Sequence, residues 1–138
     1  MRVFLDTNVL VSAFSSRGLC AELLEVVLLE HELISGRNVL NELTKALRQK
    51  IKLPVARAAE IVSFVSAEAT IVVEASAPAQ ANADPDDARV LGEALAGEAS
   101  IFVIFVTGDA ALVKLANVGA LRILSPRQFW EVLQAVNP

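Results

Sequence analysis

The run Ile101–Val106 (IFVIFV) is apolar at every position, and this restricts the folds open to the chain. A strand with one face in water alternates apolar and polar residues, whereas a continuously apolar strand is covered on both faces. Shorter strand-like runs are Arg2–Leu5, His31–Ile34, Thr70–Val73 and Leu121–Leu124. We therefore expect a central parallel sheet with helices on both faces.

The segments between these runs have the apolar spacing of helices. Val39, Leu43 and Leu47 fall on one face of a helix that opens at Ser35-Gly36. Other helices are expected at Leu19–Leu29, from Pro54, from Asp84-Pro85, from Ala110, and from Ser125-Pro126 to about Val136. Strands that alternate with helices over 138 residues predict one α/β domain spanning 1–138, a three-layer sandwich.

The composition favours a cytoplasmic protein without a membrane segment. Cys20 is the single cysteine and has no partner for an internal disulfide. The apolar runs are far shorter than the roughly 20 residues that span a bilayer. Met1–Leu5 passes directly into a strand and an acid, which is not the pattern of a signal peptide.

Four acidic residues are placed to meet at one edge of the expected sheet. Asp6 follows the first strand, and Asp109 follows the most apolar one. Asp87 lies in the first turn of a helix, and Glu42 lies in the helix after the second strand. Ligands of such sheets bind beyond the carboxyl ends of the strands, and clustered carboxylates attract hard divalent cations. This chemistry supports phosphodiester hydrolysis, in which metal activates a water and offsets charge on the transition state.

Each acid also has a purely structural explanation. Asp87 favours a helix N-terminus, Asp109 is a suitable helix cap, and Glu42 on a helix is most often solvated. Asp6 is the hardest to explain in this way, because an unpaired charge beside a buried strand is costly. Its neighbour Thr7 offers a competing account as the cap of a turn. The net charge of −4 does not exclude a nucleic-acid partner, since bound divalent ions would offset it.

The acids lie in four motifs that together resemble a known family. The motifs are Leu5-Asp6-Thr7-Asn8-Val9-Leu10, Ser35 with Leu40-Asn41-Glu42-Leu43, Asp84-Pro85-Asp86-Asp87, and Val106-Thr107-Gly108-Asp109. In this order and spacing they resemble the PIN domain (PilT N-terminus), and within it the VapC-like toxins of bacterial toxin–antitoxin systems. The resemblance extends from Arg2 to about Phe129.

The resemblance implies an endoribonuclease that depends on Mg²⁺ or Mn²⁺. Its four metal-binding and catalytic acids would be Asp6, Glu42, Asp87 and Asp109, and the helix register favours Asp87 over the adjacent Asp84 and Asp86. Asn8 and Thr107 resemble the polar residues that lie beside the metal or hold a carboxylate in place. The family also implies an RNA substrate, an antitoxin protein that blocks the site, and a homodimer.

Two segments depart from the family pattern. The stretch Glu98–Val106 is a few residues longer than usual, which affects the register of the strand that leads to Asp109. The loop Glu74–Ala83 is unusually rich in alanine.

Basic residues are candidates for contact with RNA phosphates, where positive charge supplies much of the affinity. They are Arg17, which is close in sequence to Asp6, and a cluster formed by Lys45, Arg48, Lys50, Lys52 and Arg57. The structural alternative for the cluster is that cations favour the end of a helix. Functional alternatives are a PIN nuclease that processes RNA or cleaves DNA outside a toxin–antitoxin system, and a catalytically silent binding module with the same fold.

Overall fold

One six-stranded sheet forms the centre of the computed structural model, which describes residues 1–72, 90, 94, 103–119 and 121–136. The strands are β1 (Arg2–Leu5), β2 (Glu32–Gly36), β3 (Thr70–Val72), β4 (Val103–Val106), β5 (Asn117–Val118) and β6 (Leu121–Leu124). Their order across the sheet is β3-β2-β1-β4-β6-β5. All neighbours are parallel except β5 and β6, so the expected central parallel sheet is confirmed.

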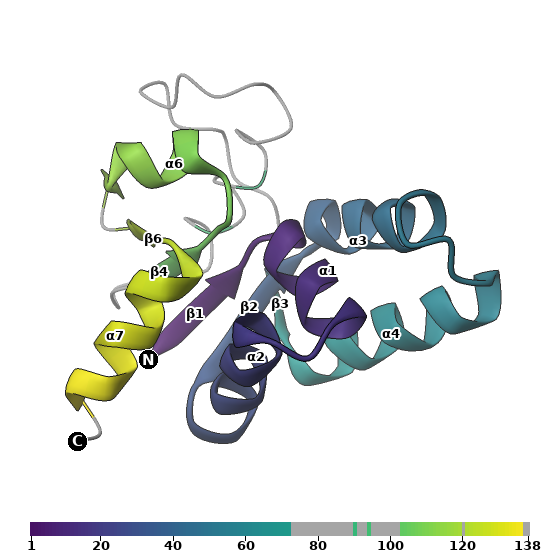
Figure 1. Ribbon diagram of the computed structural model, residues 1–138, viewed down its shortest axis with the longest axis horizontal. Coiled ribbons are helices and arrows are strands. Elements are labelled where there is room, and N and C mark those ends of the chain that lie inside the picture. The colour runs from purple at the N-terminus through teal and green to yellow at the C-terminus, as the bar shows by residue number, and fades with distance from the viewer. Residues whose placement is uncertain (73–89, 91–93, 95–102, 120, 137–138) are drawn as a thin grey trace.

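The helices of the described residues gather at the two sides of the sheet. They are α1 (Thr7–Ser15), α2 (Leu19–Glu30), α3 (Arg37–Gln49), α4 (Val55–Glu68), α6 (Ala110–Leu115) and α7 (Pro126–Val136). In Figure 1, α1 to α4 lie together on the side of β2 and β3, and α6 and α7 lie on the side of β4 and β6. The first group is therefore placed to form a wall beside the ends of β1 and β2.

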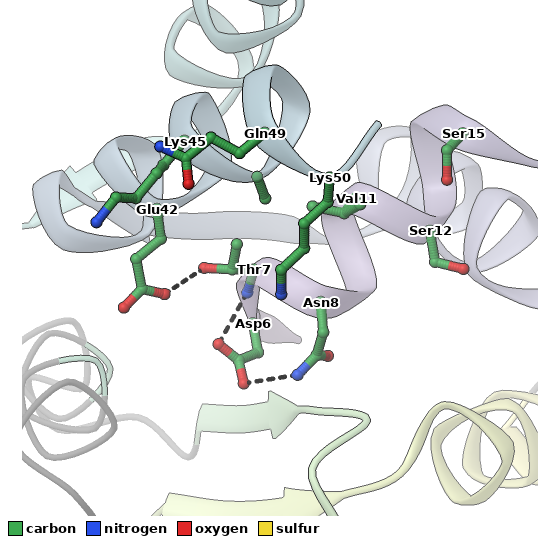
Figure 2. Close-up of a pocket in the computed structure, with 11 residues that line it drawn as sticks. Asp6, Thr7, Asn8, Val11, Ser12, Ser15, Glu42, Lys45, Gln49 and Lys50 are labelled. Carbon is green, nitrogen blue, oxygen red and sulfur yellow. Dashed lines mark hydrogen bonds between the residues drawn. The ribbon is translucent and has the colours of Figure 1, made fainter. Parts of the chain in front are cut away.

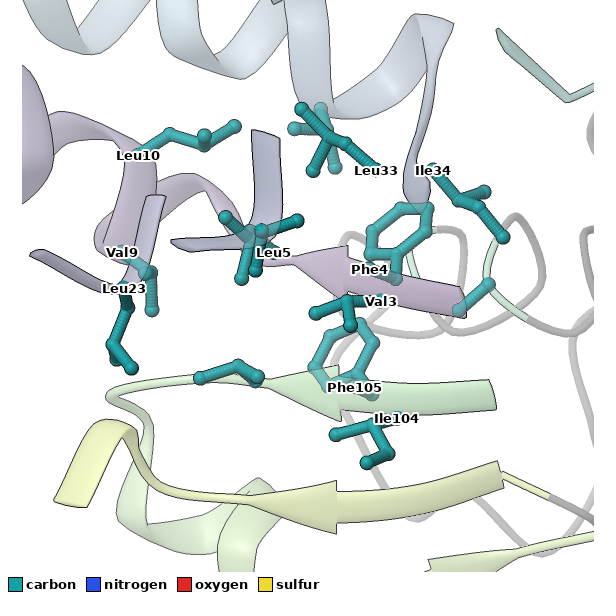
Figure 3. Close-up of a cluster of buried hydrophobic side chains, with 14 of the residues drawn as sticks. Val3, Phe4, Leu5, Val9, Leu10, Leu23, Leu33, Ile34, Ile104 and Phe105 are labelled. Carbon is teal, nitrogen blue, oxygen red and sulfur yellow. The ribbon is translucent and has the colours of Figure 1, made fainter. Parts of the chain in front are cut away.

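The two central strands are buried on both faces. Val3, Phe4 and Leu5 of β1 are all 0% exposed, and every position of β4 is buried. Because successive side chains of a strand point to opposite faces, both faces of the sheet are covered. The rings of Phe4 and Phe105 stack with centroids 5.5 Å apart and join β1 to β4 (Figure 3). Such aromatic pairs contribute about 0.5–1.5 kcal/mol beyond the burial of their area.

The structure differs from the sequence prediction directly after β1. No helix was predicted between the first strand and Leu19, but helix α1 begins at Thr7, and Asp6 is its N-cap. The helical signal is present in the sequence: Val9 and Leu10 are buried, and apolar residues follow four positions later at Ala13 and Phe14. Asp is among the residues preferred at an N-cap, because its side chain accepts from the first free N–H groups.

Other boundaries of helices and strands differ by a few residues from those predicted from the sequence. Ser35 and Gly36 belong to β2, so the helix that was expected to open there begins at Arg37. The short antiparallel strand β5 was not expected. The loop Glu74–Ala83 and the helix start at Asp84–Asp87 lie outside the described residues, although Val90 and Ala94 are helical and buried.

The last helix begins as expected at Ser125-Pro126. The Ser125 hydroxyl accepts from the Gln128 N–H at 3.1 Å, and the Gln128 side chain accepts from the Ser125 N–H at 2.9 Å. This reciprocal pair satisfies two backbone donors at the start of α7. None of the helices in the described part of the chain is both long and apolar enough to cross a membrane.

Candidate active site

The candidate site lies beside β1, where the order in which strands are added to the sheet reverses. From β1 the chain continues to β2 and β3 on one side, whereas β4 pairs with β1 on the other side. Such a point opens a crevice at the carboxyl ends of the strands. Leu5 and Val106 are register partners, and the residues that follow them are Asp6 and Thr107. Sequence positions about 100 residues apart thus meet at one edge.

Asp6 is a buried carboxylate held by three donors. Its side chain is nearly inaccessible, with the residue 6% exposed. One oxygen, Oδ1, accepts from the Thr7 N–H at 2.8 Å. The other, Oδ2, accepts from the Thr107 hydroxyl at 2.7 Å and from the Asn8 amide at 3.2 Å. An ionised carboxylate has about four acceptor positions, so these bonds orient the group and leave acceptor capacity for a cation.

The protonation of Asp6 reflects its surroundings. Burial raises the pKa of Asp6 above its ordinary value of 3.8, and the nearby negative charge of Asp109 raises it further. Hydrogen bonds from Thr107, Thr7 and Asn8 act in the opposite direction without reversing the shift. A cation beside the two carboxylates would favour the ionised form of Asp6.

Asn8 links the first turn of α1 to the loop after β4. Its amide nitrogen donates to Asp6 and, at 3.4 Å, to the Thr107 hydroxyl. Its side-chain oxygen accepts from the Gly108 N–H at 2.8 Å. A Cβ added to Gly108 would lie 3.2 Å from that oxygen, a tight contact that Asn8 must move to relieve. The backbone at Gly108 therefore passes close to Asn8 because position 108 has no side chain.

Glu42 is tied to the same turn of α1. The Thr7 hydroxyl donates to Glu42 Oε2 at 2.7 Å, across 35 positions of sequence. The Glu42 side chain is half-buried and lines the same cleft as Asp6 (Figure 2). This position differs from the fully solvated one that is usual for a helical glutamate.

Asp109 caps a helix and also lies near Asp6. Its Oδ1 accepts from the N–H groups of Ala111 at 2.9 Å and Leu112 at 3.4 Å, at the start of α6. Its own N–H donates to the Thr107 hydroxyl at 3.0 Å, so Thr107 contacts both acidic residues. The structural explanation considered for Asp109 is thus correct, but it occupies only one carboxylate oxygen within the described residues.

A cleft of about 550 Å³ opens beside Asp6 and Glu42. Of the basic candidates, Lys45 and Lys50 line it, and Arg17, Arg48, Lys52 and Arg57 do not. Arg48 donates to the Leu53 carbonyl at 2.9 Å, and Arg57 pairs with Glu60 at 3.1 Å. Arg17 follows the last turn of α1, whereas Asp6 precedes its first turn.

Several cleft residues were not singled out from the sequence. They are Val11, Ser12 and Ser15 of α1 and Ala46 and Gln49 of α3. Their spacing marks one face of each helix, but recognising that face in α1 required the helix itself to be recognised.

The described acids have the chemistry of a site for a hard divalent cation. Asp6, Glu42 and Asp109 present carboxylate oxygens, and such ions prefer oxygen ligands. The negative charge of Asp109 acts on the buried Asp6, an unfavourable pairing that a cation would relieve. Asp84, Asp86 and Asp87 lie outside the described residues. Within the described ranges, no three His, Cys, Asp or Glu side chains are grouped closely enough to hold an ion.

A family model described as the PIN domain matches residues 2–111. The chain belongs to the PIN domain family. The matched range contains all four motifs that suggested the resemblance, and the members of the family are nucleases. A search of curated proteins finds no match to this PIN domain.

Two solved structures share its fold. VapBC2 from Rickettsia felis, bound to a DNA fragment from its promoter, is similar with a TM-score of 0.62 and 13% identity, over 91% of this chain and 98% of that one. VapBC-1 from nontypeable Haemophilus influenzae is similar with a TM-score of 0.62 and 13% identity, over 92% of this chain and 99% of that one. The central sheet with helices on both faces is therefore the PIN fold.

Proposed function

We propose that this PIN domain is an endoribonuclease that depends on Mg²⁺ or Mn²⁺ and hydrolyses RNA phosphodiesters with water. The observation that carries the proposal is the buried Asp6 carboxylate, whose pKa is raised by burial and by the charge of Asp109. A buried acid with a raised pKa that lines a cleft beside a second acid is typical of functional sites. In the proposal, Asp6, Glu42, Asp87 and Asp109 hold the metal.

The roles of the surrounding residues follow from their contacts. Thr107, Asn8 and the Thr7 N–H keep the Asp6 carboxylate in one orientation. The Thr7 hydroxyl does the same for Glu42. A divalent ion held by these acids would supply a water of lowered pKa and would offset charge on the reacting phosphate. The protein's contribution is to hold the Asp6 and Glu42 carboxylates each in a fixed orientation through these hydrogen bonds.

The proposal also assigns a biological setting. Both solved structures described above are of VapBC assemblies, so we assign this chain to the toxin half of a toxin–antitoxin pair. A small antitoxin protein would then block the cleft, and the toxin would form a homodimer. The site of action would be the cytoplasm, where the RNA substrate is found.

The activity is tested with labelled single-stranded RNA and DNA, in Mn²⁺ or in chelator. We expect cleavage of RNA in Mn²⁺, none in chelator, and none with Asp6→Asn. Glu42→Gln should also abolish cleavage, while Glu60→Gln, an exposed acid paired with Arg57, should cleave as the wild type does. Circular dichroism of each variant confirms that it is folded.

Three results would contradict the proposal. Cleavage that survives both chelator and Asp6→Asn would exclude the metal site. Cleavage of DNA alone would favour a DNA nuclease of the same family. RNA binding without turnover in either metal would favour a catalytically silent module.

A further inference from the structure

The cleft continues beyond the acids as a groove between α1 and α3. One wall is the face of α1 that carries Asn8, Ser12 and Ser15, and the other is the face of α3 that carries Glu42 and Gln49. Residues three, four and seven positions apart share a helix face, so these side chains form two continuous stripes. From Asn8 to Ser15 the α1 wall is about 10 Å long at 1.5 Å per residue.

The chemical character of the groove changes along its length. Its two acidic lining residues lie toward the starts of the two walls: Asp6 is the N-cap of α1, and Glu42 is in the second turn of α3. Beyond them, the described lining residues that carry charge are Lys45 and Lys50. Neither ammonium forms an ion pair with a carboxylate of the described residues. The groove thus holds two carboxylates and two ammonium groups, and both lysines follow Glu42 along the chain.

The remaining lining supplies hydrogen-bonding groups and little bulk. Ser12, Ser15 and Gln49 carry hydroxyl and amide groups, while Val11 and Ala46 are small or short apolar residues. Figure 2 shows the Lys50 side chain extended from α3 toward Thr7 and Asn8 of α1. No aromatic side chain is among the described lining residues, so the groove has no surface on which a base would stack.

We propose that this groove binds the sugar–phosphate backbone of the RNA strand next to the cleaved phosphodiester. Lys45 and Lys50 contact phosphates, and Ser12, Ser15 and Gln49 hydrogen-bond to backbone oxygens and to the 2′-hydroxyl. Contacts to the backbone position a strand without reading its sequence, so this side of the site accepts any bases. The 2′-hydroxyl gives these side chains a means to distinguish RNA from DNA. The inference rests on the proposed ribonuclease function.

The test compares Lys45→Gln/Lys50→Gln with Arg122→Gln/Arg127→Gln, which removes the same charge from residues outside the groove. Binding of a labelled eight-nucleotide RNA is measured in Ca²⁺, in place of the catalytic metal, at several salt concentrations. Each lost phosphate contact lowers the slope of log K against log salt by about 0.7 for single strands, so the groove variant should lose about 1.4. Its affinity should fall about 10-fold for unrelated RNA sequences alike. The control should keep the wild-type slope and affinity.

Cleavage kinetics separate this inference from the proposed function. With RNA as substrate, the groove variant should show a KM about 10-fold higher and an unchanged kcat, because its lysines hold the strand and do not react. If the wild type cleaves RNA but the groove variant matches the control in slope and KM, the groove assignment is wrong. If the wild type cleaves nothing, the ribonuclease proposal fails, and the binding series still decides the groove. The groove variant could instead lose binding to an octaglutamate peptide while it binds RNA as the wild type does. That result would make the groove a peptide site and would overturn the inference.

Discussion

At the scale of single residues, Thr107 is the centre of the hydrogen-bonding network. Its hydroxyl donates to Asp6 at 2.7 Å and accepts from the Asp109 N–H at 3.0 Å, and the residue is 0% exposed. A buried acceptor that loses its donor bears the full cost of desolvation, so the network depends on this one oxygen. The same oxygen fixes the separation between the two strand-end acids.

Thr107→Val removes the hydroxyl and keeps the shape of the side chain. We expect the free energy of unfolding to fall by about 1–3 kcal/mol, since a charged acceptor is left without its shortest bond. Mn²⁺ affinity should fall about 10- to 100-fold, as for other groups that orient metal ligands. Urea unfolding and Mn²⁺ titration provide the two measurements. Thr107→Ser keeps the hydroxyl and should retain wild-type Mn²⁺ affinity; equal losses in both variants would show that the methyl group matters instead.

Gly108 is a second residue-scale test, because its missing side chain leaves room for Asn8. In Gly108→Ala the new Cβ lies 3.2 Å from Asn8 Oδ1, so Asn8 must shift by a few tenths of an ångström, which weakens its bond to Asp6. We expect a loss of about 1 kcal/mol in the free energy of unfolding and reduced cleavage. The matched control is Gly18→Ala, whose Cβ meets no atom within 4 Å. If Gly108→Ala combined with Asn8→Ala is as impaired as the sum of the single changes, the two residues act independently.

At the scale of elements, helix α1 has two roles that follow from one N-cap. Asp6 ends β1 and starts α1, so its carboxylate is held at the N-terminus of a helix that then forms a wall of the groove. The positive end of the helix dipole stabilises the ionised acid there. Burial outweighs this and the hydrogen bonds, because the pKa of Asp6 is still raised.

At the start of helix α6, substitutions of Asp109 can separate its role as N-cap from its proposed role as metal ligand. Asn is as good an N-cap as Asp, so Asp109→Asn should change the free energy of unfolding by only a few tenths of a kcal/mol. If Asp109 also binds metal, the same variant should lose cleavage by roughly 100-fold or more. Asp109→Ala removes the cap and the carboxylate together, so it should lose cleavage and also about 1 kcal/mol in the free energy of unfolding. Full activity in a stable Asp109→Asn variant would reduce Asp109 to a cap.

At the scale of the whole molecule, stability, proton binding and metal binding are linked through Asp6. The pKa of Asp6 in the folded protein lies above its ordinary value of 3.8. At pH values between these two pKa values, the folded state holds a proton that the unfolded chain has already released. The folded state then binds more protons, and the free energy of unfolding of the metal-free protein falls as pH rises through this window. Metal binding requires the ionised carboxylate and releases the proton.

We therefore expect Mn²⁺ to raise the melting temperature more as pH is increased from 4.5 to 7.5. At a hundred-fold excess over its Kd, a ligand of the folded state adds about 2.7 kcal/mol of stability. Differential scanning fluorimetry with Mn²⁺ or chelator measures the shift at each pH. Asp6→Asn should show a small shift that does not depend on pH. A wild-type shift that is equal at all pH values would exclude proton–metal competition at Asp6.

The features that could be predicted from the sequence are those that a few consecutive residues indicate. Continuous apolar runs indicated a parallel sheet, and an acid within three residues of the end of a buried run indicated where Asp6 and Asp109 would lie. Both rules need only a few consecutive residues, because a strand's burial and its end are encoded in its own side chains. The choice of Glu42 rested chiefly on the family resemblance, since a glutamate on a helix has no local mark of function.

Tertiary structure alone decided which side chains meet. Thr7 bonds Glu42 across 35 positions, and Asn8 bonds Gly108 across 100, because β1 pairs with β2 on one side and with β4 on the other. The groove exists because α1 and α3 begin at the carboxyl ends of two neighbouring parallel strands, β1 and β2. Side chains along one face of each helix then line the two walls of the groove. No local pattern contains this information. Strand order and helix packing depend on how the whole core is buried, and that free energy is shared among residues far apart in the chain.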